Sequence, residues 1–162
     1  MTEFASDRDR PPEEKPAPKS ARRRSREFVL QGLYQWRVGG ASEATIEAQI
    51  PDLEHFARAD RDFFVGTLRG VIGQQEKLIA EISSHIDRPF TELSPIEACV
   101  LMLGSFELAN HPETPYRVII NEAIELTKSF GGTDGHKYVN GVLDKVAAQV
   151  RPDEFVARNK AR

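Results

Sequence analysis

The sequence is poor in cysteine and has no long apolar run. One cysteine, Cys99, stands among 162 residues. It excludes an internal disulfide and a metal site built from several thiolates. No apolar stretch is long enough to cross a bilayer, and the N-terminus is charged and rich in proline where a secretory signal would be apolar. We therefore expect a cytoplasmic protein with no membrane partner.

Motifs for catalysis and for cofactors are missing as well. The four histidines show no close ligand spacing, and the sequence holds no Walker loop, nucleophile elbow or dinucleotide fingerprint. Asn121, Glu122 and Asn140 stand in helix-patterned segments, and we assign them to hydrogen bonds between helices. The sequence thus predicts no enzyme activity, no catalytic residue, no metal and no cofactor.

A strong excess of one charge is also absent. The net charge is -3 and the pI is about 5.8, so any binding to nucleic acid must depend on a local patch. One such patch is the arginine tract at residues 21–27, ARRRSRE, with cations at Arg22, Arg23, Arg24 and Arg26. The first turns of a helix disfavour cations unless an anion relieves them, and RNA phosphate is one such anion. A solvated charged face or a generic basic arm would have the same composition.

Apolar periodicity predicts an all-α fold. Residues 1–19 carry four prolines and few apolar groups, so we expect a disordered tail. From Ser20 onward, apolar residues recur at helical spacing. Start and stop signals for the helices stand at Ser20, Gly39–Gly40, Ser42, Pro51, Asp60, Ser94–Pro95, Thr114–Pro115, Gly131–Gly132, Asp134 and Pro152. We expect one compact bundle of about six or seven helices over residues 20–152, followed by a charged tail over residues 153–162.

Two segments resemble a known family. Residues 115–145, PYRVIINEAIELTKSFGGTDGHKYVNGVLDK, resemble the C-terminal signature of the bacterial transcription antitermination factors called NusB. ARRRSRE followed by LQGLYQW resembles the first helix of that family, so the resemblance covers about residues 21–150. The chain departs from the family pattern in its proline-rich tail, in Tyr138 where phenylalanine is common, and in Gly135.

The resemblance implies a non-catalytic helical domain that binds boxA, a short single-stranded RNA element. NusE, a ribosomal small-subunit protein, would bind beside it, within an antitermination complex with RNA polymerase that supports transcription of ribosomal RNA operons. The RNA-binding residues that we expect are Arg22, Arg23, Arg24, Arg26, Lys128, Lys137 and His85. The residues expected to contact NusE are Glu97, Asp134, Tyr138 and Val38.

Simpler explanations exist for these residues and for the whole chain. Glu97 and Asp134 suit helix caps, Tyr138 suits the core, and the lysines and His85 are ordinary surface residues. The same helical domain resembles the RNA-binding module of certain ribosomal RNA cytosine methyltransferases, which would require a separate catalytic partner. A homodimer that buries the arginine tract against acids of a second copy is a further alternative.

Overall fold

The chain folds as a bundle of helices. The structure, a computed structural model, describes residues 20–132 and 134–160, and the tail expected at residues 1–19 lies outside the described residues. Within those ranges the chain forms eight α-helices, three 3-10 turns and no strand, which confirms the all-α prediction with one helix more than expected. The α-helices are α2 (Ala21–Arg37), α3 (Glu43–Gln49), α4 (Arg61–Gly73), α5 (Gln75–Ser83), α6 (Pro95–Asn110), α7 (Tyr116–Phe130), α8 (Gly135–Val150) and α9 (Pro152–Lys160). The 3-10 turns are η1 (Ile50–Asp52), η2 (Phe56–Arg58) and η3 (Phe90–Glu92).

Side-chain caps begin four of these helices, as the sequence predicts. The side chains of Ser20, Ser42, Asp60 and Ser94 each accept a hydrogen bond from the backbone amide three residues later. These bonds satisfy amides that have no partner inside the helix. Gly40, with a φ of 70°, lies in the turn after α2, in a conformation that glycine adopts without strain. Local signals therefore determine these boundaries.

The starts of α7 and α8 differ from the prediction. Pro115, rather than Thr114, is the residue before α7. No side chain at this position caps the helix. The Tyr116 amide instead donates to Glu154 Oε1 of α9 at 2.8 Å. Asp134 precedes α8 but makes no capping hydrogen bond. The acceptor for α7 comes from a distant part of the chain, which local sequence signals do not reveal.

Helix α9 occupies the segment that we expected to be a charged tail. Pro152 begins it, at a position where the missing N–H of proline costs little. Just before it, the Arg151 guanidinium donates to four backbone carbonyls in the 107–114 segment, and the Phe155 ring packs 5.6 Å from the Tyr116 ring. Pro152 therefore marks the start of a further packed helix rather than the end of the helical domain.

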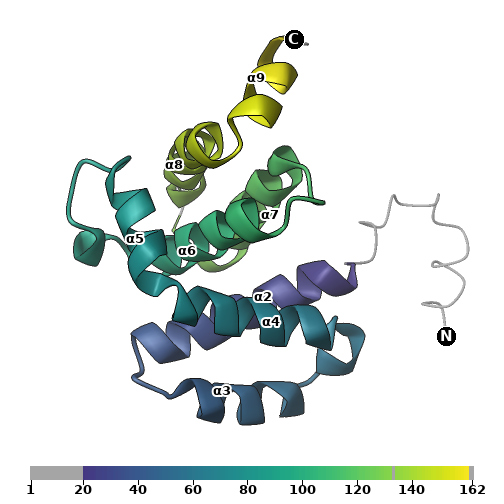
Figure 1. Ribbon diagram of the computed structural model, residues 1–162. Helices are drawn as coiled ribbons and strands as arrows, with labels where there is room; N and C mark the ends of the chain where they lie inside the picture. The colour runs from purple at the N-terminus through teal and green to yellow at the C-terminus, as the bar shows by residue number, and fades with distance from the viewer. Residues whose placement is uncertain (1–19, 133, 161–162) are drawn as a thin grey trace, which may run out of the picture.

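Helix α6 forms the centre of the bundle. Every residue from Ala98 to Leu108 is buried, and α2, α4, α5, α7 and α8 all pack against this helix (Figure 1). Gly104 allows α8 to approach closely, because a Cβ atom there would lie 2.8 Å from a methyl carbon of Leu143. Among the described residues, no helix is long and apolar enough to cross a membrane. The charged candidate residues are thus arranged around one apolar helix.

Candidate nucleic-acid interface

Arg26 lies inside the protein. Its side chain is 5% exposed, and its Nε and Nη2 groups donate to the carboxylate of Glu107, itself 2% exposed, at 2.8 to 3.1 Å. Burial acts to raise the pKa of Glu107, but its contacts with His111 and Arg26 outweigh burial and hold that pKa below its ordinary value. Arg26 is therefore removed from the candidate RNA-binding residues. Its spacing of three, four and seven residues from Val29, Leu30 and Leu33 places it on the buried face of α2, a signal that the sequence already contained.

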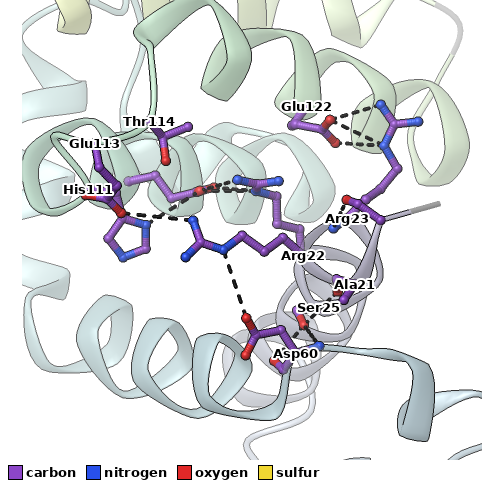
Figure 2. Close-up of polar contacts among 12 residues, drawn as sticks. Ala21, Arg22, Arg23, Ser25, Asp60, His111, Glu113, Thr114 and Glu122 are labelled. Carbon is purple, nitrogen blue, oxygen red and sulfur yellow. Dashed lines mark hydrogen bonds and ion pairs between the residues drawn. The ribbon is translucent and has the colours of Figure 1, made fainter.

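Arg23 is held by a carboxylate of α7. Its Nε and Nη2 groups donate to both oxygens of Glu122 at 2.9 to 3.3 Å, and Figure 2 shows the two side chains facing each other across the two helices. This hydrogen bond is the main cause that raises the pKa of the Arg23 guanidinium, against a smaller lowering by burial. Arg23 is 39% exposed and Glu122 is 15% exposed, so the pair lies at the surface.

The other two arginines of the tract are less restrained. Arg22 lies 4.0 Å from carboxylate oxygens of Asp60 and Glu113 (Figure 2). Its guanidinium lies 5.1 Å from the centre of the Phe63 ring. Arg24 is half-buried and has no ion pair within residues 20–132 and 134–160. Three of the four arginines, Arg22, Arg23 and Arg26, thus lie near carboxylates of this chain. These carboxylates are anions that relieve the crowding of cations at the start of α2.

A second cluster of candidate residues lines a groove between α8 and the loop that follows α5. The groove has a volume of about 360 Å³, and its lining includes His85, Lys137 and Tyr138. Sequence reasoning missed Lys145, which lines the same groove. The signal for it was available, because Lys137 and Lys145 are eight residues apart and so share one face of α8. His85 Nε2 lies 2.7 Å from Gln149 Oε1, which orients the imidazole at the edge of the groove.

Three residues expected to contact a protein partner meet where α6 and α8 begin. Asp134 and Tyr138 belong to the start of α8, and a Cβ atom on Gly135 between them would lie 3.2 Å from Glu97 Oε1 of α6. The Arg88 guanidinium lies 4.9 Å from the centre of the Tyr138 ring. Tyr138 thus belongs both to this acidic cluster and to the groove that holds Lys137.

Val38 lies beside the same region. It follows α2 and is 51% exposed. The preceding residue, Arg37, places its guanidinium 4.7 Å from the centre of the Phe90 ring, and Phe90 follows Arg88 in the loop between α5 and α6. The four expected partner contacts are therefore arranged around the loop at residues 84–94.

Lys128 lies in the last turn of α7. It is 51% exposed and lies 3.8 Å from Glu125, one helical turn away on α7. Six residues separate it from Glu122, or ~9 Å along the helix axis. Glu122 and Glu125 stand between the arginine tract and Lys128 on the wall of a narrow groove of about 100 Å³. The basic surface is therefore interrupted by acids rather than continuous.

Of the three polar residues assigned to bonds between helices, Glu122 makes such a bond, to Arg23. Asn121 is exposed, and Asn140 Oδ1 is buried without a hydrogen-bond partner in the part of the chain that the structure describes. The assignment is confirmed for Glu122 alone.

The chemistry of the described residues suits binding. Within them, no three histidine, cysteine, aspartate or glutamate side chains are grouped as metal ligands. Cys99 is fully buried in α6, and burial raises the pKa of its thiol to about 11, so little of it is thiolate at neutral pH. Exposed cations, an aromatic ring and surface carboxylates remain, and these are groups that recognise RNA and proteins.

Comparison with known proteins gives a consistent result. The sequence model of the NusB family matches residues 23–148. A transcription antitermination protein NusB from Dechloromonas aromatica (strain RCB) is 76% identical over 162 residues, which cover 100% of this chain and 99% of the relative. A solved structure of NusB from T. maritima is 29% identical with a TM-score of 0.73, covering 86% of this chain and 99% of that one.

A second solved structure shares the fold at lower identity. It is a crystal structure of the antitermination factors NusB and NusE in complex with dsRNA. The matching chain is 18% identical, with a TM-score of 0.70, and the match covers 78% of this chain and 96% of that one. At this identity the likeness extends to the helical architecture and not to individual side chains.

Proposed function

This chain belongs to the NusB family of transcription antitermination factors, which are not enzymes, and we propose that it binds boxA-type RNA together with NusE. In this role it joins the antitermination complex with RNA polymerase in the cytoplasm and supports transcription of ribosomal RNA operons. The crystal structure of NusB and NusE with dsRNA makes an RNA and a NusE partner the first ligands to test.

The observation that carries the RNA proposal is a pair of basic regions, one at the start of α2 and one in the groove beside α8. Among the described residues Arg24 has no ion pair, and Arg22 has carboxylates only at 4.0 Å. The groove beside α8 combines Lys137 and Lys145 with the Tyr138 ring and with one acid, Asp87. Cations suit phosphates, and aromatic and imidazole rings suit unpaired bases, which is the chemistry of single-stranded RNA recognition. We therefore assign the RNA backbone to α2 and the bases to the groove.

A basic partner protein fits the acidic cluster at the starts of α6 and α8. Asp134 is well exposed, Glu97 is partly exposed, and Val38 offers an apolar contact nearby. Opposite charges at an interface guide the partner and set its orientation. Tyr138 lies at the border of this cluster and the groove, so RNA and NusE would bind side by side. Each ligand should then tighten the binding of the other by the same factor.

The homodimer alternative stays a prediction, and ion pairs within one chain weaken one argument for it. It required acids of a second copy to neutralise the arginine tract, but Glu122 and Glu107 already neutralise Arg23 and Arg26 within one chain. No feature of the described residues requires a second copy for this purpose.

The test is a measurement of RNA affinity against salt concentration, with and without NusE. Three RNAs are compared: a boxA single strand, a scrambled single strand and a duplex of the same length. We expect the boxA strand to bind best, and NusE to increase that preference. Arg23→Ala/Arg24→Ala and Lys137→Ala/Lys145→Ala should each flatten the log-log salt slope by ~0.7 for every phosphate that the variant no longer binds.

The control for this test is Lys77→Ala, which removes an exposed lysine of α5 that lies outside the basic regions. It should leave both the affinity and the salt slope unchanged. Equal and weak binding of all three RNAs, with no effect of NusE, would reduce the tract to a generic basic arm.

A further inference from the structure

We propose that Glu122 is an internal competitor of RNA phosphate for Arg23 and thereby sets the affinity of the first helix for RNA. This inference rests on the proposed function, since it concerns the RNA site at the start of α2. It assigns to Glu122 a role in binding that its place in the helical scaffold does not by itself imply.

Arg23 holds the Glu122 carboxylate by two points, as an arginine can also hold a phosphate. Arg23 directs Nε and Nη2, the two groups that form a fork toward one anion, at both oxygens of the Glu122 carboxylate. A phosphate would offer two oxygens to the same fork. Figure 2 shows that the carboxylate, which comes from α7, faces this edge of the guanidinium. RNA phosphate can therefore reach these donors only by displacing Glu122.

The pair is accessible enough for such an exchange. The Arg23 side chain is 39% exposed, so it is open to solvent although it is paired with Glu122. Arg26, by contrast, is 5% exposed and is held by a buried carboxylate. An ion in solution can compete for the first arginine and has no access to the second.

The arginine tract therefore presents its cations in a graded order. Arg24 has no ion pair among the residues that the structure describes. Arg22 has only weak contacts, at 4.0 Å, with Asp60 and Glu113. Asp60 is kept beside α2 because its backbone exchanges hydrogen bonds with Ser25, as Figure 2 shows. An incoming RNA would meet Arg24 and Arg22 first, and would gain the Nε and Nη2 donors of Arg23 only where its backbone position is good enough to replace Glu122.

This competition has a consequence for affinity. A polyanion that contacts the tract loosely gains little from Arg23, because the guanidinium already has an anionic partner. Glu122 should therefore lower the affinity for every polyanion that uses Arg23.

The experiment compares four proteins: wild type, Glu122→Gln, Arg23→Ala and the double variant. Glutamine keeps the size of the side chain and removes its charge. We expect Glu122→Gln to bind the boxA strand about 1.5 to 5 times more tightly, the ratio that corresponds to a surface ion pair. Arg23→Ala should weaken binding, and the double variant should bind as Arg23→Ala does, because the gain needs the arginine.

The matched control is Glu47→Gln. Glu47 forms the same two-point pair with Arg69, at 2.6 and 2.9 Å, but this pair joins α3 to α4 and includes no residue of the arginine tract. The substitution removes an equal charge and releases an equal cation. An equal gain in RNA affinity for Glu47→Gln would show that the effect comes from net charge and would overturn the inference. An unchanged affinity for Glu122→Gln would overturn it as well.

A second probe separates this inference from the proposed function. Sodium tripolyphosphate carries the phosphate chemistry without any RNA, and its binding is measured by calorimetry on the same proteins. If the boxA strand fails to bind wild type, the proposed function fails. The competition is then judged by tripolyphosphate alone, which should bind Glu122→Gln more tightly than wild type. No gain there, or a gain that persists in the double variant, would refute the competition.

Discussion

Replacing Arg26 with alanine tests whether this residue belongs to the core. The substitution leaves the Glu107 carboxylate, 2% exposed, with His111 Nδ1 at 3.7 Å as its remaining ion-pair partner among the described residues. Breaking a buried ion pair by removing one partner typically costs 3 to 5 kcal/mol, because an uncompensated charge stays buried. We expect Arg26→Ala to lower the free energy of unfolding by about that amount. Arg69→Ala, which breaks the exposed pair with Glu47, should cost far less.

The pH dependence of this loss provides a sharper criterion. The folded-state pKa of Glu107 lies below its ordinary value of 4.5, so this group stabilises wild type above that pH, and the stability is lost as pH falls through the folded pKa. Without Arg26, the pKa of Glu107 must rise relative to wild type. The difference in stability between the two proteins should therefore be small in acid, where Glu107 is protonated in both, and should grow as pH rises.

Urea denaturation followed by circular dichroism, at several pH values between 4 and 7, measures this difference. The double variant Arg26→Met/Glu107→Met should recover much of the lost stability, because it removes both charges and fills the space with apolar atoms. A loss for Arg26→Ala that is below about 1 kcal/mol, or that is the same at every pH, would show that the pair is not buried as described.

Two further substitutions test the packing of the bundle. Gly104→Ala places a Cβ atom 2.8 Å from Leu143, so we expect a loss of about 1 to 3 kcal/mol in thermal or urea unfolding, and an unchanged stability would mean that α6 and α8 can separate freely. Glu154→Ala removes the acceptor of the Tyr116 amide, which should cost about 0.5 to 2 kcal/mol, as the loss of a helix cap does. Amide hydrogen exchange at Tyr116 should then speed up, and an unaltered exchange rate there would argue against capping by α9.

Much of the fold could be predicted from the sequence because the relevant signals act over a few residues. Ser20 and Ser94 accept hydrogen bonds from amides three positions away, and Gly40 adopts the positive φ of its turn without help from the rest of the chain. The buried face of α6 follows from its nearly continuous apolar composition. These features need only local geometry and the burial of apolar surface, so the all-α class and most helix boundaries follow from the sequence.

Which carboxylate each arginine meets was decided only by the tertiary structure. Arg23 and Glu122 are 99 residues apart in sequence, and Arg26 and Glu107 are 81 apart. The four arginines of the tract are the same residue type in the sequence. They differ in burial and in partners because each position on α2 faces different neighbours. The sequence supplied the charges, but the packing of α6 and α7 against α2 determines which of them remain available to RNA.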